Sequence, residues 1–182
     1  MTVLPIRTVP DPVLRTPTQT VGSADVARLV ADMTETMHAV RGVGLAAPQV
    51  GVGLRLFVFD CDGVAGHVLD PVLETEGEDT TEPGEGCLSV PGLHYRPPRA
   101  VRARVTGRNV DGEPVAYAGE GLLARCLQHE VDHLDGMLFV DRLVGDERRE
   151  ARRRMNAGEV DRAGATVTAR RSAAVGSVFG RR

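Results

Sequence analysis

The residues best suited to do chemistry in this chain stand in the run His129-Glu130-Val131-Asp132-His133. Positions four apart on a helix lie one turn above each other, so His129 and His133 would project from one face and could share a metal ion. Glu130 would point to the side of that pair, where its carboxylate can move a proton of a water at the metal. The spacing therefore predicts a hydrolytic metal site; a structural metal site in a binding module is the non-enzymatic alternative.

Two imidazoles do not complete such a site, because a catalytic metal usually takes three protein ligands and keeps one position for water. The protease pattern with a third His fails here, since Phe139 stands where that His would be. Cys87 could be a buried apolar residue, a nucleophile or the thiolate that completes a His₂Cys set. A metallopeptidase with a different third ligand also stays open, and its downstream candidates are Glu147, Glu150 and Glu159.

Composition narrows the class of protein. The chain has 182 residues and 42% are hydrophobic, which is typical of one globular domain. The formal charge is −3, so no overall basic field favours DNA, and the few aromatic residues argue against base stacking. Three widely spaced cysteines do not make a disulfide framework, and no apolar run is long enough to cross a membrane. We therefore expect a cytoplasmic protein with free thiols.

Further elements must position these residues. Apolar residues at spacings of three and four predict an amphipathic helix from about Ser23, as its N-cap, to about Arg41, with His38 off the apolar stripe. The run before His129 has helical character, and residues 146–157 could form a polar helix. The pattern also predicts strands over 54–60, 64–73, 100–107 and 114–118, a hairpin turn over 109–113, and a solvated acidic loop over 74–85.

Three blocks stand in order along the chain: Gly42-Val43-Gly44-Leu45-Ala46-Ala47-Pro48-Gln49, Glu85-Gly86-Cys87-Leu88-Ser89, and the His129–His133 run. In this order and spacing the chain resembles the peptide deformylases, from its Pro-rich start to about Leu143. The resemblance implies an α+β fold, in which antiparallel strands pack around a central helix that carries the metal motif. We expect a catalytic domain over residues 1–145, and a charged, Arg-rich tail over 146–182 that is weakly packed or partly helical.

The resemblance also implies an activity, which is removal of the N-formyl group from newly made chains that begin with formyl-methionine. Glu130 matches the catalytic acid and base of the family. Gln49 matches the side chain that polarises the formyl oxygen, and Leu88 matches the backbone N–H that assists it. The family's metal ligands match Cys87, His129 and His133.

The resemblance implies one divalent metal ion, with Fe²⁺ favoured, although Zn²⁺, Ni²⁺ or Co²⁺ also suit a His₂Cys set by geometry. We expect the substrate peptide to lie extended along Val43 and Gly44. Leu122 and Cys126 are candidate walls of the methionine pocket, while ordinary core packing is the alternative for both. In some relatives a basic C-terminal helix contacts the ribosome, so the Arg-rich C-terminus makes the ribosome a candidate partner; a solvated charged face is the simpler interpretation.

Overall fold

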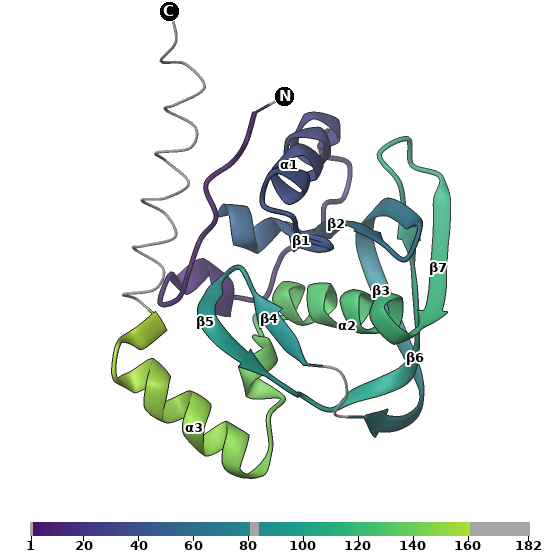
Figure 1. The fold of residues 1–182 in the computed structure, drawn as a ribbon. Coiled ribbons are helices and arrows are strands. Elements are labelled where there is room, and N and C mark those ends of the chain that lie inside the picture. The colour runs from purple at the N-terminus through teal and green to yellow at the C-terminus, as the bar shows by residue number, and fades with distance from the viewer. Residues whose placement is uncertain (1, 81–83, 161–182) are drawn as a thin grey trace, which may run out of the picture.

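The structure is a computed structural model that describes residues 2–80 and 84–160. Helix α2 (Gly121–Leu134) lies against a five-stranded antiparallel sheet near the centre of the molecule (Figure 1). The α+β class implied by the resemblance is confirmed, because antiparallel strands and helices share this one body. The sheet has the order β1 (Gly44–Ala46), β2 (Leu56–Cys61), β3 (Val64–Thr80), β6 (Arg99–Arg108) and β7 (Pro114–Glu120), and a separate pair joins β4 (Glu85–Cys87) to β5 (Val90–Tyr95).

The core between α2 and the sheet is built from alternating strand residues that face one stripe of the helix. Phe57, Phe59 and Val105 are almost fully buried there against Leu127 and Leu134 of α2. Burial on this scale stabilises by roughly 1.5–3 kcal/mol for each large apolar side chain, relative to leaving it exposed. The helix is therefore held rigidly along most of its length, which suits an element that carries reactive side chains.

Helix α1 (Ala27–Ala39) covers β1 and β2 through buried residues on one stripe, as the spacing predicted. The expected start at Ser23 is wrong. Val26 occupies the N-cap position, and the Asp25 carboxylate accepts a hydrogen bond from the Ala27 N–H at 3.1 Å. The helix ends before Arg41, whose φ of 57° lies in the left-handed region. That residue turns the chain towards β1.

The acidic loop expected over residues 74–85 is wrong, because β3 continues to Thr80 and pairs with β6. Glu74 stands opposite Arg104 and Glu76 opposite Arg102, with closest charged atoms at 3.8 and 3.5 Å. Opposite charges directly across a ladder stabilise the pairing slightly, so an acidic segment can be solvated on one face and still be a strand. The sequence around Asp70-Pro71 forms a bulge in this strand, where Asp70 has a φ of 51°.

The other predicted elements agree with the structure. The hairpin of β6 and β7 turns at residues 109–113, where the Asn109 N–H donates to Glu113 O at 2.9 Å. Helix α3 (Gly145–Asn156) corresponds to the polar helix expected over 146–157, and its Ala151 is buried against a third core cluster. The remainder of the expected tail, 161–182, lies outside the described residues. No described helix has the length and apolar character needed to cross a membrane.

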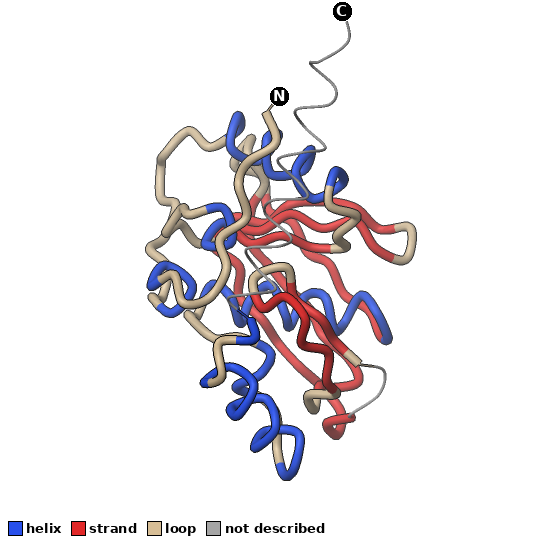
Figure 2. Tube along the Cα trace, turned by 60° about the vertical axis from the view of Figure 1, so that its left-hand side comes forward, coloured by secondary structure: helices blue, strands red, loops and turns tan. Residues whose placement is uncertain are grey.

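The Pro-rich lead-in runs as an extended segment along one side of the molecule (Figure 2). Short 3₁₀ helices interrupt the coil on this side: η1 (Pro12–Arg15), η2 (Ala47–Val50) and η3 (Phe139–Asp141). The Arg7 N–H donates to Gln49 O at 2.7 Å, and the Val9 N–H donates to Ser89 O at 2.9 Å. The lead-in therefore fixes η2 to the turn between β4 and β5, so two of the sequence blocks are held side by side.

Candidate active site

A cysteine and two histidines converge beside α2. The ligand atoms of Cys87, His129 and His133 all lie within 4.8 Å of one another, and within the described residues this is the one such group of three or more potential metal ligands. Cys87 Sγ lies 3.2 Å from His133 Nε2, and the two imidazole rings have centroids 4.9 Å apart. The spacing of four residues on α2 explains why the two histidines lie together, while the thiol belongs to the last residue of β4.

The electrostatics of the cluster fit a divalent metal ion. Burial raises the pKa of the Cys87 thiol, but charge and hydrogen bonds from His133 and His129 outweigh it and lower that pKa well below its usual value. The thiolate is the form that binds metals. His129 Nδ1 lies 2.9 Å from Glu85 Oε2, which leaves its Nε2 to face the cluster. His133 Nδ1 and Glu130 Oε2 are buried with no hydrogen-bond partner among the described residues.

A buried chain of charges extends outward from His129. Glu85 holds Arg99 by two bonds of 2.8 and 3.0 Å, and Arg99 Nη1 bonds Asp132 Oδ2 at 2.6 Å. Asp132 also accepts from Arg142 at 2.6 Å. Burial raises the pKa of Glu85, but hydrogen bonds from His129 and Arg99 lower it to about 2. An ionised carboxylate therefore orients the first imidazole, as carboxylates commonly do behind metal ligands.

Glu85 corrects the sequence analysis, which placed it in a solvated loop. Only 5% of its side chain is exposed, because its two partners, Arg99 and His129, replace water. A usable signal was present: Glu85 and Cys87 are two residues apart on one strand, so their side chains lie on the same face. Asp132, which immediately precedes His133, was also given no role at the site, although the sequence placed it on the same helix as the two histidines.

Glu130 sits beside the cluster with an unusual pKa. Burial is the main cause that raises it, opposed by charge on His129 and His133, and the pKa comes to about 7. Gly44 of β1 faces this carboxylate so closely that a Cβ there would lie 2.3 Å from Glu130 Oε1. The position therefore requires glycine if the acid is to keep its place next to the edge of the sheet.

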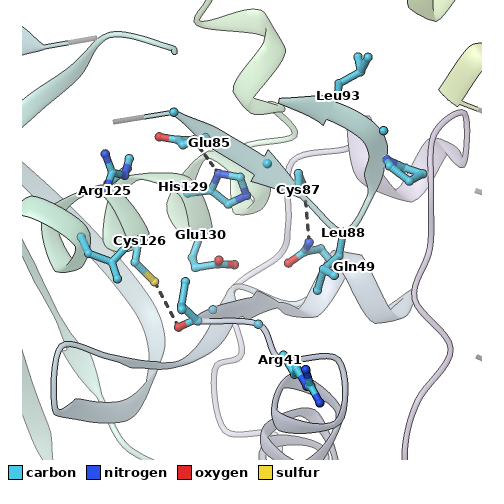
Figure 3. A pocket seen from close by; sticks show the side chains of 18 residues that line it. Arg41, Gln49, Glu85, Cys87, Leu88, Leu93, Arg125, Cys126, His129 and Glu130 are labelled. Carbon is cyan, nitrogen blue, oxygen red and sulfur yellow. Dashed lines mark hydrogen bonds and ion pairs between the residues drawn. The ribbon is translucent and has the colours of Figure 1, made fainter. Parts of the chain in front are cut away.

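Gln49 and Leu88 flank the thiol from the opposite side (Figure 3). Gln49 Oε1 accepts from the Ala46 N–H at 2.8 Å, and its Nε2 lies 3.3 Å from Ser89 Oγ and 3.7 Å from Cys87 Sγ. The Gln49 amide is thus both hydrogen-bonded and directed towards the cluster. The Leu88 N–H donates to no acceptor among the described residues.

A pocket of about 530 Å³ opens over these groups. All four residues expected at the substrate lie on its wall: Val43, Gly44, Leu122 and Cys126. Leu122 and Cys126 also pack in the core cluster, so their two interpretations are not exclusive. Arg41 and Arg125 also line this wall and were not predicted from the sequence, although Arg125 lies on α2 one turn from both Leu122 and His129.

The downstream acids lie elsewhere. Glu147 accepts from the Arg96 N–H at 3.1 Å, and Glu150 and Glu159 pair with neighbouring arginines. None of the three belongs to the cluster of Cys87 and the histidines. The metallopeptidase alternative requires one of them there, so the geometry does not support it.

Comparison with known proteins gives one family. The family model for polypeptide deformylase matches residues 3–149. The chain is 51% identical over 174 residues to the peptide deformylase of Acidothermus cellulolyticus, covering 94% of this chain and 95% of that one. It is 53% identical over 172 residues to the peptide deformylase of Mycolicibacterium paratuberculosis, covering 84% and 87% respectively.

Solved structures agree with this. The crystal structure of peptide deformylase from Thermus thermophilus matches with a TM-score of 0.81 and 42% identity, over 90% of this chain and 99% of that one. The peptide deformylase of Synechococcus elongatus, solved in complex with actinonin, matches with a TM-score of 0.76 and 37% identity, over 83% and 85% of the two chains.

Proposed function

The chain belongs to the polypeptide deformylase family, and from this premise we propose how its own residues remove the N-formyl group from the N-terminal methionine of newly made polypeptides. The reaction is a metal-dependent amide hydrolysis that releases formate and a free amino terminus. The observation that carries the assignment of residues is the convergence of three ligand atoms within 4.8 Å, beside the buried carboxylate of Glu130.

Cys87, His129 and His133 hold one divalent metal ion in this proposal. A metal with open positions in such a site supplies Lewis acidity, which brings the pKa of a bound water towards neutrality. Glu85 keeps His129 in the tautomer whose Nε2 faces the ion, through its 2.9 Å contact with Nδ1. Fe²⁺ is the favoured ion, with Zn²⁺, Ni²⁺ or Co²⁺ able to replace it, because all accept mixed thiolate and imidazole ligands. Metal analysis of protein purified without air tests this choice.

Glu130 is the proton carrier. Its carboxylate takes a proton from the attacking water and passes it to the amine nitrogen as the C–N bond breaks. A pKa of about 7 suits both steps at neutral pH. Negative charge that develops on the formyl oxygen meets the Gln49 amide and the Leu88 N–H, which act as hydrogen-bond donors. Gln49 is only 2% exposed, which strengthens its interaction because little water competes for the oxygen.

The substrate backbone adds to the sheet beside β1, which is the edge strand in the order β1-β2-β3-β6-β7. Val43 O accepts from the Asp60 N–H of β2, so by strand alternation the N–H and C=O of Gly44 point to the free edge. An extended peptide can pair there with its first residue next to Glu130. The methionine side chain then enters the pocket, against the apolar wall that includes Leu122 and Cys126.

One experiment tests these roles. Formate release from a formyl-methionyl peptide is measured for Glu130→Ala and Cys87→Ser, together with the metal content of each variant. Glu130→Ala should keep its metal and lose turnover by about 10²-fold or more, since a positioned acid and base contributes this much. Cys87→Ser should lose or change its metal. A Glu130→Ala variant with undiminished turnover would overturn the assignment of the proton carrier.

The place of action and the further partner are also part of the proposal. Formylated chains emerge from ribosomes in the cytoplasm, where we place the enzyme. Helix α3 carries five arginines, and three of them are already paired with acids of the same segment. Among the described residues, Arg148 and Arg152 form no ion pair with an acid, and both are candidates for contact with ribosomal RNA phosphates. Co-sedimentation with ribosomes at increasing salt, with both residues changed to Ala, tests this contact.

A further inference from the structure

The buried chain of charges behind His129 ends at the surface in Arg142, which does not line the pocket. Arg142 is the C-cap residue of η3 and its side chain is 45% exposed, whereas Asp132 on α2 is buried. The guanidinium of Arg142 donates from Nη2 to Asp132 Oδ1 at 2.6 Å and from Nε to Asp132 Oδ2 at 3.2 Å. Both oxygens of this carboxylate are thus bonded by one planar fork, which fixes the orientation of the acid.

Arg99, the first residue of β6, connects Asp132 to the carboxylate behind the imidazole. Its Nη1 donates to Asp132 Oδ2 at 2.6 Å, while its Nε and Nη2 donate to the two oxygens of Glu85 at 2.8 and 3.0 Å. The guanidinium group is planar and rigid, so these three bonds fix Asp132 and Glu85 relative to each other. Glu85 Oε2 in turn lies 2.9 Å from His129 Nδ1 (Figure 3). An unbroken series of short contacts therefore joins Arg142 to a proposed metal ligand.

Arg142 also influences which carboxylate Arg99 favours. Both guanidiniums donate to Asp132 Oδ2, and two cations at one oxygen repel each other. With Arg142 in place, the negative charge of Asp132 is shared by two cations, so neither is drawn fully to it. Without Arg142, this buried carboxylate would lose one of its two cationic partners, which is costly. We expect Arg99 to shift towards Asp132 in response. That shift loosens Glu85 and leaves His129 less firmly oriented.

The backbone that carries Arg142 is itself fixed in the core. Phe139 and Val140 of η3 are buried in the third core cluster, and the Arg142 N–H donates to Phe139 O at 3.2 Å. The Phe139 ring also stacks beside the His129 ring, with centroids 6.2 Å apart. The segment after α2 therefore returns to the metal site, and the arginine at its end is a fixed support rather than a mobile surface charge.

We propose that Arg142 is a positioning residue for the metal centre and acts, through the buried chain of charges, on the orientation of His129. The intervening members are Asp132, Arg99 and Glu85. Loss of a group that directly orients a metal ligand weakens metal binding by about 10–100-fold. Because Arg142 acts from a greater distance, we expect its loss to weaken binding by about threefold to tenfold. The proposal rests on the metal site of the proposed function.

The first test is a chelator competition for zinc on the full chain, since zinc is diamagnetic and does not change its oxidation state. Wild type, Arg142→Ala and Glu85→Gln are compared with Arg15→Ala as the matched control. Arg15 is 41% exposed and pairs with Asp141, the neighbour of Arg142, so the control removes a similar surface ion pair outside the chain of charges. Arg142→Ala should weaken zinc binding, and Arg15→Ala should leave it unchanged.

A double-mutant cycle separates positioning from a general loss of stability. Because Arg142 acts through Glu85 in this proposal, the variant with both changes should bind zinc as weakly as Glu85→Gln and no more weakly. Two independent effects would add instead. Arg142→Lys keeps the charge and a single bond to Asp132, so it should recover part of the lost affinity.

A spectroscopic measurement follows the imidazole itself. In the zinc-loaded protein, the Nδ1 proton that His129 shares with Glu85 should give a downfield proton resonance, identified as the imidazole resonance that Glu85→Gln shifts. Arg142→Ala should shift the same resonance, and Arg15→Ala should not. A merely structural role of Arg142 would lower the free energy of unfolding without moving this signal.

The outcomes that overturn this proposal differ from those that overturn the proposed function. Wild-type zinc affinity in Arg142→Ala, additive losses in the double variant, or an unmoved resonance would each show that Arg142 does not position His129. A wild-type protein that binds no zinc would instead remove the metal site itself, and this proposal with it. Should Arg142→Ala fail to fold, Arg142→Gln, which keeps a hydrogen-bond donor without the charge, replaces it in the same three measurements.

Discussion

The raised pKa of Glu130 leads to a stability measurement that needs no substrate. Burial raises this pKa from its ordinary 4.5 to about 7. A shift of this size corresponds to about 3 kcal/mol, at about 1.36 kcal/mol per pH unit. Because the folded state binds the proton more tightly than the unfolded state, the carboxyl stabilises the fold fully below pH 4.5. That contribution is lost as the pH rises through about 7.

The perturbation is Glu130→Gln in protein stripped of metal by a chelator. The amide cannot ionise, so the variant is not destabilised by a buried charge as the pH rises. Its free energy of unfolding, relative to wild type, should rise as the pH increases from 5 to 8, and the total gain should be about 3 kcal/mol or somewhat less. Titrating groups far from Glu130 are present in both proteins and cancel in the difference.

Urea unfolding at pH 5, 6, 7 and 8 measures the difference directly. Glu78→Gln removes an exposed carboxylate on β3 and controls for the loss of a charge. In the metal-loaded protein the pH dependence should shrink, because a nearby cation favours the ionised carboxylate. A difference between wild type and Glu130→Gln that stays constant within about 0.5 kcal/mol over this range would refute the reasoning from burial.

Three further substitutions test the site. Glu85→Gln should weaken metal binding about 10–100-fold in a chelator competition, because the carboxylate that orients His129 is lost; unchanged affinity would show that the imidazole is positioned without it. Gly44→Ala places a methyl group 2.3 Å from Glu130 Oε1 and should lower kcat about tenfold or more while the metal content stays normal. Gln49→Ala should reduce kcat by about 10²–10³ with metal retained, as expected for an oxyanion donor, and a change in KM alone would argue for substrate binding instead.

Local pattern accounts for much of the agreement between sequence and structure. The hairpin of β6 and β7 follows from alternation and turn residues that are adjacent in the chain. The wrong start of α1 has a local cause, because the Asp25 carboxylate and not Ser23 accepts from the first N–H of the helix. The missed end of β3 has a non-local cause, because residues 74–80 have a loop-like composition. Cross-strand arginines such as Arg102 and Arg104 made an acidic segment a strand.

The family blocks brought Gln49, Cys87 and Leu88 to the site, whereas their chemistry alone left alternatives open. Gln49 could equally have been a satisfied amide, and the structure shows it bonded to Ala46 and Ser89 while it faces the thiol. The residues that neither route found are those whose role depends on burial. The position of Arg125 on a helix could be predicted, but its place on the pocket wall depends on the segments that pack around that helix.

The sequence by itself determined that His129 and His133 share a helix face with Glu130 beside them, because the helical period is local and needs no other part of the chain. The chemistry of the residues alone left three roles open for Cys87, and the tertiary structure shows its thiol, 46 residues before His133, beside the two imidazoles. It also decided that Glu85 is a buried, ionised partner of His129 rather than a solvated acid. A charge leaves water only when distant partners replace that water, and the folded chain alone brings Arg99 and His129 to the same carboxylate.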